Sequence, residues 1–248
     1  MKLSKIFELL TQGELSQVFV GGTESGQILE KSYRSMGNNV FLGLTALYKR
    51  FNLKFNTLEV QLMPGIYTYP LLQKFAVNDQ YSKEPVRFIL DSPVDKFKGD
   101  ILKVWGVQTD KGNGLVMNDY MDGLAVETPS LNVIRMPMAI VDKERDLNDY
   151  YKTDRVRVTY VANHKQFVPD VGYFDPQLTE IELPDSHVQA LLYYIASRVN
   201  NPIGMAAEFH AGNNWAARYE AECNLLEARG NQVDRAGKID VIRRGGWA

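Results

Sequence analysis

The sequence has very little cysteine and no long apolar run. Cys223 is the single cysteine in 248 residues, which excludes an internal disulfide and a multi-cysteine zinc site and fits a reducing compartment. No apolar stretch reaches the roughly 18 residues that a membrane-spanning helix needs. The segment at 1–10 is too short and too charged for a secretory signal. We therefore expect a soluble protein that is not secreted and has no membrane partner.

Neither sign of charge is in excess. The chain has 28 Lys and Arg against 30 Asp and Glu, a formal net charge of -2, so it lacks the basic excess of a dedicated nucleic-acid binder. Its hydrophobic content is 45%. That content, over this length, is enough for one large core or two small ones.

Residues that carry catalysis are also scarce. The three histidines are His164, His187 and His210, and no two have the His-x-x-x-His spacing that puts both on one helix face. No Gly-x-Ser-x-Gly elbow occurs. We therefore predict no enzyme activity, no metal and no cofactor. A hydrolase would have to gather two or more candidates in one pocket: Asp119, Asp122, His164, His187 and His210.

Two segments resemble ligand loops. Residues 21–26 are rich in glycine before a helix, but no Gly-Lys-Ser/Thr follows, and Glu24 would repel an anion. Residues 118–123 start like a calcium loop, but Tyr120 takes the third ligand position and Pro129 the twelfth. We predict an ordinary loop with capping candidates Thr23 and Ser25, and a turn.

Helical patterns occupy the two ends of the chain. A short amphipathic helix is predicted over 3–11, and a long one over 27–51. The long pattern places apolar residues three or four apart, at Leu29, Tyr33, Met36, Val40, Leu44, Leu47 and Phe51. Gly37 and Gly43 inside it each cost about 1 kcal/mol relative to Ala, so packing must hold this helix together.

The closing segment predicts two more helices. Asp185 is expected to cap the first, with His187 in its first turn in a surface or capping role. Its buried face should carry Val188, Leu191, Leu192, Ile195 and Val199. Asn201 and Pro202 then start a helix over 203–229, which ends at Gly230. Its buried side should carry Ala206, Phe209, Ala216, Tyr219, Cys223 and Leu226, and His210 should lie on a solvated face.

Short apolar runs with period two fill the middle and predict strands, over 58–63, 66–69, 101–107, 115–117, 133–141 and 156–161. The turn at 110–114 should join two of them as a hairpin. Residues 70–98 give no clear pattern. The predicted class is α+β: a helical bundle from the N- and C-terminal helices, with an inserted, mainly antiparallel sheet or sandwich and an extended C-terminal tail. The predicted segments are 1–52, 53–182, 183–230 and 231–248.

The polar tail at 231–248 ends with apolar residues and two arginines. Burying Ile239, Val241, Ile242 and Trp247 in a partner would gain about 1.5–3 kcal/mol each. Fixing roughly 18 residues costs at least about 1 kcal/mol apiece in backbone freedom. One tail alone would therefore bind weakly. Binding would become strong if the tail also paired as a strand with its partner, or if the tails of many copies on one ring bound together. A frayed terminus is the other interpretation.

The order of these elements resembles the head-to-tail adaptor, or connector, proteins of short-tailed bacteriophages. The resemblance covers nearly the whole chain. It depends on the helix over 26–51, the strand-rich insertion with Val60 to Pro70, the helix opened by Leu183-Pro184-Asp185 with Tyr193 to Arg198, and the long helix with Trp215 to Tyr219 before the tail.

This resemblance implies a virion protein that forms a ring of twelve subunits under the portal, assembled in the host cytoplasm. The helices would surround a channel through which double-stranded DNA passes without sequence-specific contacts, and a tail tube or nozzle protein would bind below. The residues expected to bind the portal are Ile239, Val241, Ile242, Arg243, Arg244 and Trp247. Subunit packing would use exposed positions of the helices at 27–51 and 203–229.

The alternative is a module that binds single-stranded nucleic acid through stacked aromatics. The chain has 13 Tyr, 11 Phe and 3 Trp, but stacking platforms interleave aromatics with Lys and Arg. Only 48–51 and 150–157 offer that mixture. This hypothesis predicts that binding falls steeply with salt and needs Tyr150 and Arg155.

Overall fold

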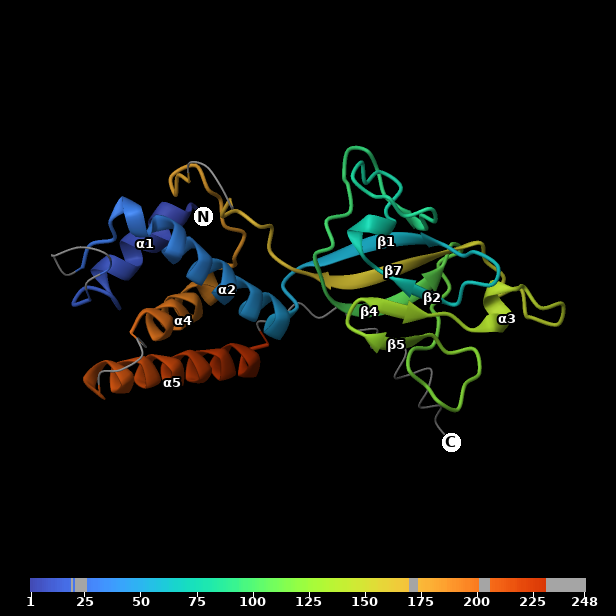
Figure 1. The fold of residues 1–248 in the computed structure, drawn as a ribbon. Coiled ribbons are helices and arrows are strands. Elements are labelled where there is room, and N and C mark those ends of the chain that lie inside the picture. The colour runs from blue at the N-terminus through green and yellow to red at the C-terminus, as the bar shows by residue number, and fades with distance from the viewer. Residues whose placement is uncertain (19, 21–25, 170–173, 201–205, 231–248) are drawn as a thin grey trace, which may run out of the picture. The chain divides into compact units, whose positions relative to one another are not determined.

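The computed structural model divides the chain into two compact units (Figure 1). The helical unit combines both ends of the chain, Met1–Leu53 and Gln166–Ala248, and the β unit is the middle, Lys54–Lys165. The structure describes residues 1–18, 20, 26–169, 174–200 and 206–230. The fold is α+β as predicted, with helices from both ends of the sequence and antiparallel sheets between them.

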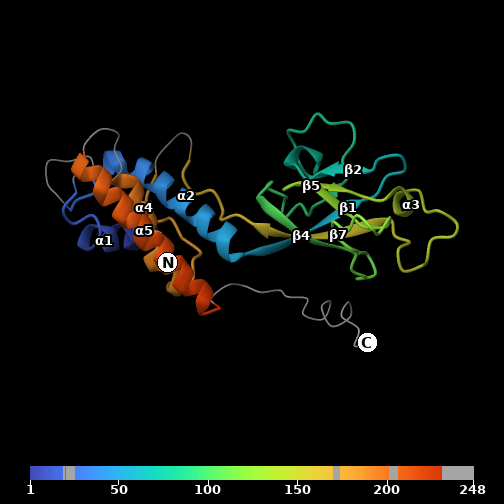
Figure 2. The same ribbon diagram turned by 90° about the horizontal axis from the view of Figure 1, so that it is seen from below.

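The helical unit consists of helices and short helical turns from the two chain ends. Its described elements are α1 (Leu3–Gln12), the 3-10 turn η1 (Glu30–Ser32), α2 (Tyr33–Phe51), the 3-10 turn η3 (Asp185–His187), α4 (Val188–Val199) and α5 (Ala206–Ala228). Helix α4 packs against α1, α2 and α5 and lies between α2 and α5 in Figure 1. Seen from below, α5 covers much of α4 (Figure 2).

Helix α1 confirms the first predicted helix. It buries Leu3, Ile6, Phe7 and Leu10, the face that the amphipathic pattern indicated. Its start is tied to the segment before α4. The Leu3 amide donates to the Thr179 carbonyl at 2.9 Å, and the Met1 amino group donates to the Ile181 carbonyl at 2.9 Å. These bonds join residues 174–181 to the helices, whereas the sequence placed the end of the strand-rich segment at 182.

Helix α2 begins later than predicted. The regular helix starts at Tyr33, after a 3-10 turn. Ile28 forms an isolated parallel bridge with Val20, so the chain is still extended where the helix was expected to start, and Leu29 is 37% exposed. From Met36 to Phe51 the predicted apolar positions are buried. The predicted caps Thr23 and Ser25 lie outside the described residues.

The two glycines inside α2 lie where other side chains approach the helix closely. A Cβ on Gly37 would be 3.0 Å from the Phe174 ring and from Val168. A Cβ on Gly43 would be 2.6 Å from Leu191 Cδ1 and 2.9 Å from Tyr194 Cδ1, both on α4. The absent side chains therefore allow the close packing that offsets the poor helix propensity of glycine.

The start of α4 differs from the prediction. Asp185 does not cap the helix, because a 3-10 turn over Asp185–His187 comes first and neither helical element has a side-chain cap. That turn directs His187 inward, where it is 2% exposed, and its ring meets Phe51 edge-on with centroids 4.7 Å apart. The predicted surface position of His187 is therefore wrong. Leu191, Leu192 and Ile195 are buried as predicted.

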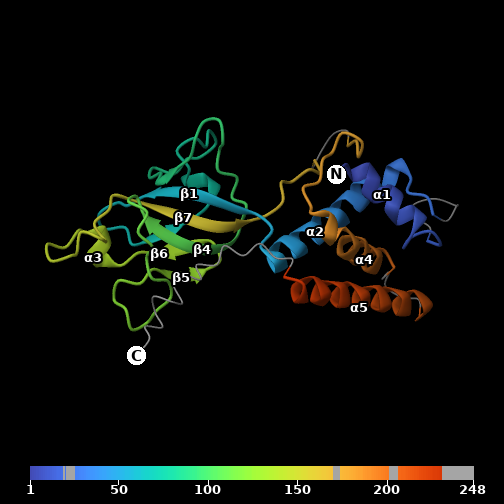
Figure 3. The same ribbon diagram turned by 180° about the vertical axis from the view of Figure 1, so that it is seen from behind.

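The β unit contains two antiparallel sheets. The first has the strand order β3-β1-β7-β4, formed by β1 (Phe55–Gln61), β3 (Ile89–Leu90), β4 (Ile101–Thr109) and β7 (Arg155–Ala162). The second has the order β2-β6-β5, formed by β2 (Thr68–Pro70), β5 (Glu127–Ser130) and β6 (Val133–Arg135) (Figure 3). One apolar core includes residues from both sheets, among them Val60, Tyr69, Ile134 and Val158.

Two predicted strands are wrong in part. Residues 133–141 form β6 and then the short helix α3 (Met138–Val141), because Pro137 has no amide proton to extend the strand and instead starts the helix. Residues 115–117 form no strand. The Leu115 amide donates to the Val107 carbonyl at 2.8 Å, as in a hairpin, but the Val126 amide then donates to the Val116 carbonyl at 2.8 Å and the chain leaves β4.

Residues 70–98, which gave no clear pattern, form a loop-rich segment with its own aromatic packing. It contains the 3-10 turn η2 (Gln73–Phe75) and β3. Phe75 stacks on Phe88 with centroids 4.8 Å apart, and Phe88 meets Tyr69 edge-on at 5.1 Å. Lys74 forms an ion pair with Glu84 at 2.7 Å. These contacts order a segment that has almost no regular structure.

Candidate assembly surfaces

The predicted portal-binding residues all lie in the C-terminal tail. Ile239, Val241, Ile242, Arg243, Arg244 and Trp247 belong to 231–248, outside the described residues, so the predicted extended tail stays a prediction. The helix that leads into the tail is described, and it is the candidate surface that the structure defines best.

Aromatic side chains fix α5 on α4. Trp215 stacks on Tyr193 with ring centroids 5.7 Å apart, and Tyr219 packs on Tyr194 at 5.4 Å. The Arg218 guanidinium lies 4.7 Å from the centre of the Trp215 ring, within the range of a cation–π contact. Further along α5, Cys223 is fully buried, as predicted for a small core residue. Burial raises the pKa of its thiol, which favours the neutral form.

Arg50 clamps the last turns of α5 to the end of α2. Its Nη1 lies 2.6 Å from Glu220 Oε2, its Nε lies 2.7 Å from Glu227 Oε1, and its Nη2 donates to Asn224 Oδ1 at 2.8 Å. All three partners project from one face of α5, at the spacing of successive helical turns. The hydrogen bond from Arg50 holds the pKa of Glu227 below its usual range. The clamp therefore holds the last turns of α5 against the end of α2.

The neighbouring residue Tyr48 also ties α2 to the chain before α4. Its hydroxyl donates to the Glu182 carbonyl, and burial raises the pKa of the phenol to about 12. The aromatic and basic mixture at 48–51 is therefore part of the packed interior, with Tyr48 and Phe51 buried. It offers no stacking platform for nucleic acid.

The opposite face of α5 carries exposed apolar side chains. Ala217, Ala221, Leu225 and Ala228 are spaced three or four residues apart, which places them on one face of the helix. All four are exposed, and Leu225 is 41% exposed. We name these four residues the outer stripe. Ala216, predicted to be buried, is exposed as well.

Sequence reasoning missed the outer stripe because the buried side of α5 was assigned first. The predicted buried side included Tyr219, Cys223 and Leu226, and the outer face was covered only by the general expectation that exposed positions of this helix pack against other subunits. The signal was the second set of apolar positions at helical spacing. On α2 the exposed positions of the expected packing surface are more polar: Ser35, Asn38, Leu42 and Lys49.

The described residues considered for a hydrolase are divided between the two units. Asp119 and Asp122 lie in a turn of the β unit, as predicted for 118–123, and there they accept bonds from backbone amides. His164 is 4% exposed in the β unit, and His187 is buried in the helical unit. The side chain of His210 lies outside the described residues. Among the residues that the structure describes, no three His, Cys, Asp or Glu side chains form a metal-binding group.

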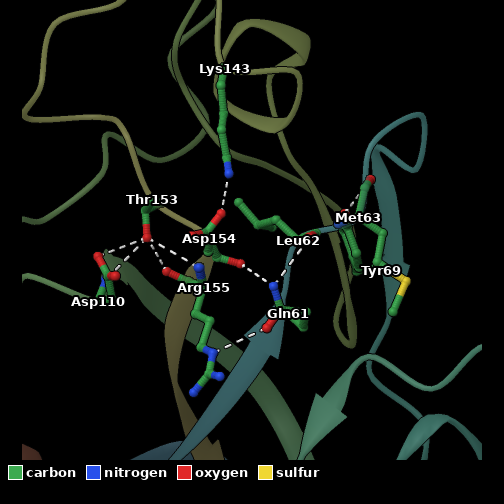
Figure 4. Close-up of polar contacts among 9 residues, drawn as sticks. All are labelled: Gln61, Leu62, Met63, Tyr69, Asp110, Lys143, Thr153, Asp154 and Arg155. Carbon is green, nitrogen blue, oxygen red and sulfur yellow. Dashed lines mark hydrogen bonds and ion pairs between the residues drawn. The ribbon is translucent and has the colours of Figure 1, made fainter.

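A polar network lies beside a hollow at one end of β1 and β7 (Figure 4). The hollow has a volume of about 450 Å³ and is lined by Glu59, Gln61, Asp110, Asp154, Arg155, Val156 and Arg157. In the network, Arg155 Nε donates to Gln61 Oε1 at 3.1 Å, and Gln61 Nε2 donates to the Asp154 carbonyl at 2.9 Å. Lys143 pairs with the Asp154 carboxylate.

The centre of this network is the Thr153 hydroxyl, which contacts Asp110 Oδ1 at 2.9 Å and the Arg155 carbonyl. A hydroxyl has one proton to donate, so it serves one of these acceptors at a time. The contact with Asp110 holds the 110–114 turn against the start of β7, whereas the contact with Arg155 is local to the segment that enters β7.

The second aromatic and basic mixture, at 150–157, is also engaged in contacts within the β unit. Tyr150 packs edge-on against Tyr151 and donates its hydroxyl proton to the Gly114 carbonyl at 3.0 Å. Arg157 pairs with Glu59 across the strands at 3.2 Å, and Lys152 pairs with Asp149 at 3.0 Å. Acidic partners reduce the positive potential that a nucleic-acid phosphate would meet.

None of the helices in the described parts of the chain is both long and apolar enough to cross a bilayer. Comparison of the sequence with protein-family models and with curated proteins gave no match.

Proposed function

We propose that this protein is a structural virion component, a head-to-tail adaptor that forms a ring of twelve subunits under the portal of a short-tailed bacteriophage. Two grounds support the proposal: the order of the elements along the sequence, and one structural observation. Helix α5 is apolar on two opposite faces, and the described residues cover only one of them. A helix that is apolar on both sides packs against two neighbours.

The outer stripe is suited to a second copy of the chain. Alanine lets another helix approach closely, and Leu225 supplies the large apolar side chain at that contact. The four residues of the stripe carry no charge, and Glu220 and Glu227 on the adjacent face are held by Arg50. Arg218 and Arg229 border the stripe, seven residues before and four residues after Leu225. A neighbouring subunit that covers the stripe would leave these long side chains at the edge of the contact, where their charged ends stay in water.

In this proposal the tail docks the ring on the portal. The Arg50 clamp fixes the end of α5, and the residues after Gly230 then carry Ile239, Val241, Ile242, Arg243, Arg244 and Trp247 toward the partner. Weak binding by each tail becomes strong when twelve tails act together. DNA passes through the ring without sequence-specific contacts, and a tail tube or nozzle protein binds to the ring.

The experiment is co-sedimentation with the portal ring encoded by the same genome. The full chain, a chain cut after Gly230 and the stripe variant Ala221→Glu/Leu225→Glu are compared. The control for added surface charge is Tyr81→Glu/Val94→Glu, because both side chains are exposed on loops of the β unit. We expect the full chain and the control to bind in a fixed ratio to the portal, the cut chain to fail and the stripe variant to bind in fewer copies.

Each result separates the parts of the proposal. Binding by the cut chain would keep the adaptor and move the portal contact to the helices. If the stripe variant binds the portal in as many copies as the full chain, α5 has no role in forming the ring. If the full chain does not bind, the adaptor function fails. Binding of single-stranded nucleic acid that weakens with salt and needs Tyr150 and Arg155 is then the function to test.

A further inference from the structure

The loop between β4 and β5 displays two adjacent apolar side chains at its tip. Tyr120 is 94% exposed and Met121 is 97% exposed. Tyr and Met are both enriched in the buried centres of protein interfaces. Tyrosine contributes a large contact area with few rotatable bonds, and methionine adapts its shape to the pocket that receives it. We name residues 119–122 the loop tip.

The base of this loop is anchored in the β unit. Asn118 adopts a left-handed conformation with φ of 52°. Its amide donates to the Val126 carbonyl at 2.9 Å, and its side-chain oxygen accepts from the Thr128 amide at 2.8 Å. Val126 is fully buried and Ala125 is 8% exposed. The loop is therefore anchored to the core at both ends, at Asn118 and at Val126.

The tip itself is ordered by two consecutive turns. The Asp122 amide donates to the Asp119 carbonyl at 3.2 Å, and the Ala125 amide donates to the Asp122 carbonyl at 3.0 Å. The two carboxylates strengthen these turns, because Asp119 Oδ1 accepts from the Met121 amide at 3.0 Å and Asp122 Oδ1 accepts from the Leu124 amide at 2.9 Å. A loop held in this way loses little conformational freedom when a partner binds.

The charge of the tip restricts what the partner can be. Asp119 and Asp122 flank the two apolar side chains with two negative charges. Nucleic acid and anionic lipid surfaces repel such a tip. A protein pocket with an apolar floor and Lys or Arg on its rim complements it, because the floor buries Tyr120 and Met121 while the rim faces the carboxylates.

We propose that the loop tip is a docking knob for a protein of this chemistry, the tail component that follows the adaptor. The identity of the partner rests on the proposed adaptor function, whereas the portal contact is assigned to the tail of the chain. The knob is therefore a second interface, on the β unit, with a separate partner.

The test measures binding of the full chain to two purified probes from the same genome, the portal ring and the tail tube or nozzle protein. We expect Tyr120→Ala/Met121→Ala to weaken binding to the tail protein at least about tenfold, as buried anchor residues do, and to leave portal binding unchanged. The matched control is Tyr81→Ala/Val94→Ala. These side chains are 90% and 96% exposed on other loops of the β unit, and their loss should change neither affinity.

A second variant tests the charge. Asp119→Asn/Asp122→Asn keeps both side-chain oxygens that accept the amide bonds and removes only the negative charges. We expect weaker binding to the tail protein and a smaller dependence of that binding on salt. Equal affinity and equal salt dependence in this variant would contradict the basic rim.

The outcomes distinguish the knob from the adaptor function. If the Tyr120→Ala/Met121→Ala variant binds both probes like the unchanged chain, the knob is refuted and the adaptor stands. If this variant loses ring formation while it still binds the tail protein, the tip contacts a neighbouring copy and the proposal is overturned. If the unchanged chain binds the portal and not the tail protein, the knob fails alone. Failure with both probes removes the adaptor function and the knob with it.

Discussion

Replacing Gly43 by alanine tests whether the packing of α2 on α4 determines the stability of the helical unit. Two effects oppose each other. Alanine in a helix interior is more favourable than glycine by about 1 kcal/mol. The new Cβ, however, would lie 2.6 Å from Leu191 Cδ1 and 2.9 Å from Tyr194 Cδ1, about 1 Å inside the usual separation of carbon atoms.

The steric effect should dominate. Leu191 is fully buried and cannot swing into solvent to make room, and close-packed interiors resist such shifts. Overpacking costs about 1–3 kcal/mol. A cost near the upper half of that range, less the gain in helix propensity, leaves a net loss of about 1–2 kcal/mol. For a unit of this size the melting temperature should fall by roughly 3–7 °C.

Thermal unfolding followed by helix circular dichroism measures this change. Gly123→Ala is the control, because a Cβ there meets nothing within 4 Å. Leu191→Ala alone should destabilise by about 2–5 kcal/mol through the cavity it leaves. The double variant Gly43→Ala/Leu191→Ala should be more stable than the sum of the single effects predicts, since the new methyl group partly fills that cavity. A Gly43→Ala chain as stable as the unchanged protein, or more so, would refute the reasoning.

Two further predictions concern polar contacts. Arg50→Gln should speed amide hydrogen exchange in the last turns of α5, while Arg218→Gln on the same helix should not. Because Arg50 lowers the pKa of Glu227, this stabilisation is present above the unfolded pKa of about 4 and is lost as the pH falls through the lower folded value, so exchange in the Arg50→Gln chain should lack that acid dependence. Thr153→Val should destabilise the β unit by about 1–3 kcal/mol in urea unfolding, because Asp110 and the Arg155 carbonyl lose a partner; equal stability to the exposed control Thr57→Val would count against the network.

Periodicity predicted those parts of the fold in which one apolar face decides the structure. The buried faces of α1, α2 and α4 and the strands β1, β4 and β7 follow directly from spacing. The start of α4 does not, because Asp185 has the residue type of a cap, and only the observed 3-10 turn shows that His187 is directed inward onto Phe51. Likewise, residues 133–141 are apolar throughout. Pro137 was the signal that the strand would end and a helix begin.

The candidate surfaces were harder to predict because they consist of side chains that the folded chain leaves exposed. Ala217 and Ala221 carry no chemical signal of their own, and they become informative once Tyr219 and Cys223 are known to face α4 and α2. Tyr120 and Met121 were recognised as part of a turn. Their near-complete exposure depends on amide bonds to Asp119 and Asp122, and a sequence pattern does not reveal those bonds.

The way the β unit is inserted lets the two proposed interfaces be tested independently. The β unit begins at Lys54 and ends at Lys165, next to the paired strands β1 and β7. Phe55 lies opposite Val161, and the Ala162 amide donates to the Lys54 carbonyl at 2.9 Å. Paired strands therefore close the base of the β unit, so that the helical unit contains the whole insertion as one short link. The entropy cost of closing a loop rises only slowly with its length, so the length of this insertion has little effect on the helical unit. A substitution at the loop tip should leave the packing of α5 intact, and a substitution in the outer stripe should leave the 118–126 loop intact, so a loss of one binding partner can be assigned to one surface.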